Sequence, residues 1–317
     1  MNQLIAPYGG PLVNLIDPAE SEALKQEALG LPSLDLDWRQ QCELEMLMSG
    51  AYSPLAGFMT RAQCMQVATE MKLDDGTFWP LPVTLGSRQK IAAELKPGDR
   101  VALRDGEGFM LAVLTVSDAW QDGDSWHLGG RVEGASLPSH PDFASLRATP
   151  TELRALLARR GWRRVIAWQA HHPMHRAQFE FCLKSAIENE ANLLLHPQVG
   201  GDITDAPGYF GLVRSFLAIR ERFPAATTQL SLLPAPPREA STRALLLRAA
   251  GDEVHDRVAH EQLVERRIAQ RLQFAVVADA RRVAGDEMQV GAAAPDHFQQ
   301  EFVDAPRRVL RRFRTGD

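Results

Sequence analysis

The chain has 317 residues, of which 45% are hydrophobic and 24% are charged, and its formal net charge is −5 at pH 7. This composition is typical of a globular protein long enough for two domains, and its mild acidity argues against a nucleic-acid partner, which usually meets a basic surface. Three widely spaced cysteines, no signal-peptide pattern at the start and no apolar run of roughly 18 residues predict a cytoplasmic protein without a membrane partner.

Residues 1–140 predict a small domain rich in β-strands. Short apolar runs at 80–86, 100–104 and 110–116 have the composition of strands and are separated by Gly- and Pro-containing turns. Closely spaced short strands with one or two helices favour a β-barrel-like domain. The segment 134–141, Gly-Ala-Ser-Leu-Pro-Ser-His-Pro, predicts a linker to the next domain.

The second half of the chain alternates between helical and strand patterns. Thr149-Pro-Thr-Glu is a capping box with proline at the first helical position, and it predicts a helix over 150–160. Further segments follow in the order strand, helix, strand, helix, strand, helix at 163–168, 173–190, 191–195, 211–223, 228–233 and 238–250. This alternation predicts a parallel sheet with crossover helices, whose ligands bind at the carboxyl ends of the strands.

A polar loop with three histidines follows the first of these strands, between Gln169 and His175. His175 opens the next helix, and a helix start offers free N–H groups and partial positive charge to an anion. We therefore predict a site for phosphate or another oxyanion. Two alternatives stay open: a surface loop in which histidines occur by chance, and a zinc site formed by His171, His172 and His175, although no Cys or carboxylate lies at ligand spacing.

Two further loops follow the second and third strands. The second contains the pair Gly200 and Gly201, which allows close backbone approach to a ligand. The third leads Arg238 into the first turn of a helix. Three loops at the same edge of one sheet predict a phosphate-binding rim. Arg214, in the intervening helix, is expected either to face the phosphates or to lie on the surface.

Several strings resemble the ATP sulfurylase (sulfate adenylyltransferase) family over most of the chain. They are Leu4-Ile-Ala-Pro-Tyr-Gly-Gly-Pro-Leu-Val-Asn-Leu, Leu47-Met-Ser-Gly-Ala-Tyr-Ser-Pro-Leu-Ala-Gly-Phe-Met, Leu194-Leu-His-Pro-Gln-Val-Gly, Gly201-Asp-Ile and Pro237-Arg-Glu-Ala. The resemblance implies an α/β plus β fold: an N-terminal PUA-like β-barrel over 1–140, a Rossmann-like parallel α/β nucleotidyltransferase domain over 141–284, and a small C-terminal segment over 285–317 that is shorter than in the family. Tyr52, Phe58 and Met59 of the second string are expected to pack in the core or at an interface.

The resemblance also implies a reaction. In this family ATP and sulfate, with Mg2+, give adenosine 5'-phosphosulfate (APS) and pyrophosphate, and catalysis rests on positioning and charge neutralisation. Homo-oligomers and an attached APS kinase domain or subunit are the partners that it implies. The residues carried over are catalytic Gln169 and His175, and sulfate- or phosphate-binding Gln169, His171, His172, Gln178, Gly200, Gly201 and Arg238.

The chain departs from the family pattern at this site. Where the family has Gln-x-Arg-Asn-Pro-x-His-x-x-His, His171 replaces the Arg, His172 the Asn, and Gln178 the second His. An arginine is always charged and binds oxyanions bidentately, whereas a histidine is mostly neutral at pH 7. Pro236 replaces a glycine of the third loop, and a Gly-Arg-Asp-His block is missing after Gly251. We therefore predict a sulfate adenylyltransferase-type protein with a degenerate active site; the alternatives are an inactive domain with a structural or regulatory role beside an APS kinase, and a nucleotidyltransferase for another oxyanion.

Overall fold

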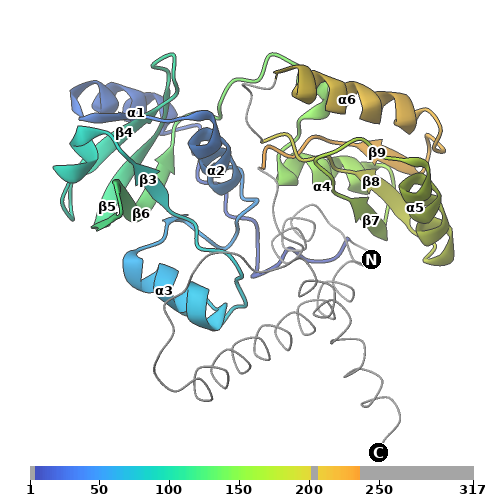
Figure 1. Ribbon diagram of the computed structural model, residues 1–317, viewed down its shortest axis with the longest axis horizontal. Helices are drawn as coiled ribbons and strands as arrows, with labels where there is room; N and C mark the ends of the chain where they lie inside the picture. The colour runs from blue at the N-terminus through green and yellow to red at the C-terminus, as the bar shows by residue number, and fades with distance from the viewer. Residues whose placement is uncertain (1–3, 201–205, 236–317) are drawn as a thin grey trace, which may run out of the picture. The chain divides into compact units, whose positions relative to one another are not determined.

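The computed structural model describes residues 4–200 and 206–235, which form two sheet regions (Figure 1). The predictions for Gly201, Arg238, the helix at 238–250, the missing block and the segment 285–317 lie outside the described residues. No helix within the described ranges is long and apolar enough to cross a membrane.

The N-terminal region contains three α-helices and six strands. In chain order they are α1 (Ser21–Glu27), β1 (Ser33–Asp35), α2 (Trp38–Met48), β2 (Gly57–Phe58), α3 (Arg61–Glu70), β3 (Leu85–Ser87), β4 (Arg100–Arg104), β5 (Met110–Asp122) and β6 (Ser125–Gly134). The sheet order is β1-β4-β5-β6-β2, and β3 also pairs with β6. Since β2 and β3 share one edge of β6 and β1 pairs with β4 alone, the pairing of the described strands does not close into a barrel.

The strand predictions for this region are partly confirmed. The strand at 100–104 matches β4, and the one at 110–116 is the first half of the longer β5, which forms a hairpin with β6. The predicted strand at 80–86 is wrong except at its end, because Pro80 and Pro82 have no N–H for a ladder. Three helices form where one or two were expected. The predicted linker starts as part of the sheet, since the N–H groups of Ala135 and Ser136 donate to the Leu111 carbonyl.

The core of this region includes residues of the long family-like string. Tyr52, Phe58 and Met59 are each at most 3% exposed, as expected. Gly57 in the same string faces the neighbouring strand so closely that a Cβ there would overlap the carbonyl oxygen of Gly130. The glycine is therefore required by close backbone approach between β2 and β6.

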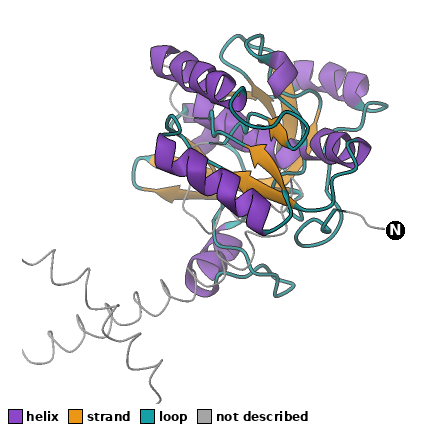
Figure 2. Cartoon of the chain, turned by 90° about the vertical axis from the view of Figure 1, so that its right-hand side faces the viewer, coloured by secondary structure: helices purple, strands orange, loops and turns teal. Residues whose placement is uncertain are grey.

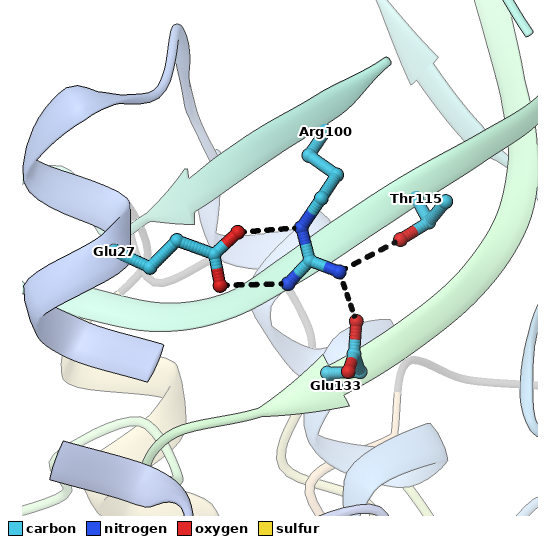
Figure 3. A network of polar contacts seen from close by, with 4 residues as sticks. All are labelled: Glu27, Arg100, Thr115 and Glu133. Carbon is cyan, nitrogen blue, oxygen red and sulfur yellow. Dashed lines mark hydrogen bonds and ion pairs between the residues drawn. The ribbon is translucent and has the colours of Figure 1, made fainter. Parts of the chain in front are cut away.

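An ion-pair network fastens α1 to the sheet (Figure 3). The guanidinium of Arg100, on β4, pairs bidentately with Glu27 at 2.7 and 3.0 Å. Its remaining Nη1 donates to Glu133 on β6 at 2.9 Å and contacts Thr115 on β5 at 3.5 Å. One arginine thus joins a helix to three strands, a geometry that lysine could not reproduce.

The second region has the predicted parallel α/β arrangement. Its elements are α4 (Pro150–Arg159), β7 (Val165–Trp168), α5 (Arg176–Glu188), β8 (Asn192–Leu195), α6 (Ala206–Arg220) and β9 (Thr228–Leu230). The order β7-β8-β9 is parallel throughout. Two helix starts differ from the prediction: α6 begins five residues earlier than 211, and α5 begins at Arg176 rather than at 173 because His175 has the extended backbone of an N-cap.

Helices cover both faces of this sheet. Leu193, Leu195 and Leu230 pack against α5 and α6. The alternate residues Ala167 and Leu194 pack against α4 on the other face. Figure 2 shows strands flanked by helices in this way. This alternation decides which side chains at the strand ends share a face.

Candidate functional site at the carboxyl edge of the parallel sheet

Three polar residues form a row just beyond the ends of β7, β8 and β9. Trp168, Leu195 and Leu230 end the three strands and are paired in register. The residues that follow them, Gln169, His196 and Ser231, therefore lie side by side as well. The ladder continues through them, since the His196 N–H donates to the Trp168 carbonyl at 2.8 Å. By the alternation of the strands, all three side chains lie on the face covered by α4. We call Gln169, His196 and Ser231 the strand-end row.

The polar atoms of this row are buried without partners. Gln169 is 7% exposed, His196 3% and Ser231 1%. Both amide atoms of Gln169, the Nδ1 of His196 and the Oγ of Ser231 have no hydrogen-bond partner among the described residues. A buried polar group without a partner costs roughly 1–3 kcal/mol, and such groups concentrate where a ligand is to be bound.

The imidazole of His196 is held neutral by its surroundings. Burial lowers the pKa of His196 from 6.5 to about 4, because the charged form would lose its hydration. At neutral pH it therefore offers one N–H donor and one acceptor nitrogen rather than a positive charge.

The histidine loop between β7 and α5 has a different character. His171, His172 and His175 are exposed, while Gln169 at the start of the loop is buried. The rings of His171 and His172 meet edge to face with centroids 5.3 Å apart. His172 lies four residues before the first residue of α5, so it falls outside the helix, as we expected for the shifted His-x-x-His pattern. The loop thus presents imidazoles to solvent beside the start of α5.

Gln178 has a structural contact at the same helix start. Its Oε1 accepts the backbone N–H of His175 at 3.2 Å, which satisfies one of the donors that a helix start leaves free. The same N–H cannot also donate fully to an anion. Nearby Arg176 does not supply a free charge either, because its Nε pairs with Glu180 at 2.7 Å along the helix surface.

The second and third loops contribute less than the sequence suggests. The backbone N–H of Gly200 donates to the Ala235 carbonyl at 3.0 Å, so it extends the sheet instead of facing a ligand. Arg214 is exposed on α6, with its guanidinium carbon 5.9 Å from the centroid of the Phe210 ring. This placement matches the surface alternative for Arg214.

The described residues provide no cluster of three His, Cys, Asp or Glu side chains that could hold a metal ion. Magnesium prefers oxygen ligands and is commonly bound through one or two carboxylates together with substrate phosphates. The strand-end row offers one amide, one imidazole and one hydroxyl group but no carboxylate, so it does not form a magnesium site of its own.

Some of the candidate residues were not singled out from the sequence. His196 and Ser231 belong to the strand-end row, and Gln198, two residues after His196, is 2% exposed with both amide atoms unpartnered among the described residues. A signal was present for His196, which directly follows the buried Leu193-Leu-Leu run of β8. The parallel register was needed to show that His196 and Ser231 lie beside Gln169.

Comparison with known proteins identifies relatives of both regions of the chain. A PUA-like domain family model matches residues 5–153, and an ATP-sulfurylase family model matches residues 144–253. The chain is 34% identical over 271 residues to a sulfate adenylyltransferase of Eremothecium gossypii, with 76% of this chain and 53% of the relative covered. It is 37% identical over 284 residues to a sulfate adenylyltransferase of Emericella nidulans, covering 77% and 49% respectively.

A solved structure, described as a hexameric APS kinase from Thiobacillus denitrificans, is 74% identical and superposes with a TM-score of 0.77, covering 79% of this chain and 52% of that one. The chain thus spans about half the length of the relatives that it matches. A PUA-like domain followed by an ATP-sulfurylase domain places this chain in the ATP-sulfurylase family.

Proposed function

We propose that the carboxyl edge of β7-β8-β9 is a sulfurylase-type site that binds ATP and sulfate, or a related oxyanion, and forms APS and pyrophosphate slowly. The observation that carries this proposal is the buried amide of Gln169, which has no partner among the described residues and opens the loop that leads into α5. The amide of Gln169 has two N–H donors that can hydrogen-bond to the oxygens of an oxyanion. Ligands of open parallel α/β sheets bind in the crevice outside the carboxyl ends of the strands, which is where Gln169 lies.

The slow rate follows from the charge of the proposed site. Sulfate must approach the α-phosphorus while negative charge accumulates, and fixed donors have to stabilise that charge. His171 is exposed, stands where the family has arginine, and is not a permanent cation. The amide of Gln178 already caps α5. Each missing charged contact costs about 2–4 kcal/mol of transition-state stabilisation, or a factor of roughly 30 to 1,000 in rate.

A second candidate function is an inactive sulfurylase-like domain beside an APS kinase. It is favoured by the Thiobacillus denitrificans relative, which is described as a hexameric APS kinase and is about twice as long as the matched region. In this proposal the domain belongs to a longer, oligomeric cytoplasmic protein. The domain limits 1–140, 141–284 and 285–317 are also proposals.

Sulfate-dependent release of pyrophosphate from Mg-ATP, coupled to pyrophosphatase, tests the first candidate against the second. The full-length protein should release pyrophosphate only with sulfate, at a rate far below the median enzyme turnover of about 10 per second. The triple variant His171→Arg, His172→Asn, Gln178→His should be faster. The exposed Lys184→Gln on α5 is the matched control and should leave the rate unchanged.

The outcomes separate the candidates. No release from either the wild type or the triple variant, with the fold intact by circular dichroism, would favour the inactive domain. Release at an ordinary enzymatic rate in the wild type would refute the idea that the exchanged loop residues weaken the site.

A further inference from the structure

A cavity of about 210 Å³ lies between the two sheet regions, and none of the loop histidines lines it. It is bordered by α2, by the connection that leads to α4, by the first turn of α4 and by the segments that follow β8 and β9. Most of its lining is apolar, including Met46, Leu137, Leu153 and Leu232. Such a mostly apolar concave site with a few polar groups is typical of small-molecule sites.

Arg147 supplies a positive charge to this cavity. Its Nη2 donates to the Tyr209 hydroxyl at 3.2 Å, which leaves the charge itself uncompensated. The Nε and Nη1 atoms are buried and have no hydrogen-bond partner among the described residues, and no carboxylate in the described ranges lies within 4 Å. Arg147 as a whole is half-buried, but donors shielded from water and left without a partner are costly, so this guanidinium favours an anion in the cavity.

His196 provides a second polar group on the cavity wall. It is 3% exposed and its Nδ1 has no partner among the described residues. Because the cavity is the space next to this imidazole, a ligand there could hydrogen-bond to it without adding charge. His196 is not one of the loop histidines, but it lies in register beside Gln169, so this cavity adjoins the strand-end row.

The other charged groups of the cavity are already paired. Glu45 accepts a short contact from the His140 ring at 2.7 Å, and both side chains are at most 10% exposed. Glu152 is engaged in the capping box of α4, where its carboxylate accepts from the Thr149 N–H and hydroxyl at 2.9 Å. The one lining charge left over among these groups is therefore the positive charge of Arg147.

We propose that this cavity is a second ligand site, which binds a small monoanionic carboxylate through Arg147 and His196 and encloses its apolar body. One uncompensated positive charge matches one negative charge. The volume suits a compact body of about ten non-hydrogen atoms, and the apolar walls disfavour a fully hydrated ion such as free sulfate. The proposal does not depend on adenylyl transfer at the histidine loop.

Titration calorimetry of the full-length protein with sodium benzoate as the probe tests this site. Benzoate should bind, and neutral benzamide, which has the same shape, should bind at least tenfold more weakly. Arg147→Met should weaken benzoate at least tenfold while retaining most of the apolar side-chain volume. His196→Leu should weaken it about threefold to tenfold, and Arg163→Gln, which changes an exposed arginine before β7, should leave it unchanged.

Two further measurements keep the test decisive. If Arg147→Met does not fold, Arg147→Lys is the substitute, because it keeps the charge but alters the donor geometry. This variant should bind benzoate more weakly than the wild type without losing binding altogether. Benzoate should also shift the imidazole NMR signals of His196, assigned by their loss in His196→Leu. No benzoate binding, equal affinity for benzamide, or binding that leaves His196 unmoved would each overturn the proposal.

Discussion

The buried imidazole of His196 should make the folded protein sensitive to mild acid. Replacing it by leucine removes the titrating group from a site that is 3% exposed. The expected result is a protein whose free energy of unfolding falls less between pH 7 and pH 4 than that of the wild type. Leucine has a comparable size and no polar atom to leave unpartnered, so the fold should tolerate it.

The magnitude follows from the two protonation states. Burial lowers the pKa of His196 from 6.5 to about 4. Below pH 6.5 the unfolded chain takes up a proton that the folded chain refuses, so stability is lost as the pH falls toward the folded pKa. Each pH unit in this window costs about 1.4 kcal/mol, which amounts to about 3 kcal/mol between pH 6.5 and pH 4. Above pH 6.5 the imidazole is neutral in both the folded and the unfolded chain, so His196 adds no pH dependence to the free energy of unfolding.

Urea unfolding at pH 7.5, 6, 5 and 4.5, followed by circular dichroism, measures this difference. The buffers should contain no small carboxylates, because the cavity beside His196 is the proposed carboxylate site. The exposed His172→Gln is the matched control and should keep the wild-type pH dependence. His196→Gln should flatten the profile as His196→Leu does, since neither side chain titrates. Parallel pH profiles for wild type and both His196 variants would refute the reasoning.

Three other substitutions test the packing of the two sheet regions. Gly57→Ala should prevent folding or lower the free energy of unfolding by about 3 kcal/mol or more, measured by urea denaturation of the soluble fraction, because the new Cβ would overlap the Gly130 carbonyl. Leu194→Ala, at a fully buried position between the sheet and α4, should cost about 3 kcal/mol in the same assay. Arg100→Gln should cost about 1 kcal/mol, and less in 1 M salt, because its pair with Glu27 is partly exposed.

Leu194→Ala and Arg100→Gln each have a control on the surface of the same region. Phe181→Ala, at a side chain that is 60% exposed, should change the free energy of unfolding by less than about 0.5 kcal/mol. Arg88→Gln, at another exposed arginine of the N-terminal region, should lack the salt-dependent loss. A loss in Leu194→Ala no larger than that in Phe181→Ala would contradict the assignment of Leu194 to the core. Wild-type stability in Gly57→Ala would contradict the close approach of β2 and β6.

The elements predicted best from sequence are those with strong local signals. The capping box at Thr149 marks the start of α4, and the apolar run 191–195 matches β8 to within one residue. The alternation of helix and strand was enough to predict a parallel sheet. The family-like strings pointed to the PUA-like and ATP-sulfurylase domains that the comparisons support.

Elements whose signals are not local were predicted less well. The strand β1 has three residues and is stabilised by pairing with β4, about 70 positions later in the chain. The N-terminal sheet was expected to close into a barrel, but closure depends on which edge of β6 accepts β2 and β3. Composition carries no information about such long-range pairing.

The sequence by itself determined the family, the order of the two domains and the histidine-rich loop, because each depends on residues that are neighbours in the chain. The tertiary structure alone decided that Gln169, His196 and Ser231 lie in one buried row, although 27 positions separate the first two and 35 positions the last two. It also decided that Arg147 faces a cavity without a counter-charge among the described residues. Register and burial arise from the pairing of distant strands, so only the folded chain determines which polar atoms are left without partners.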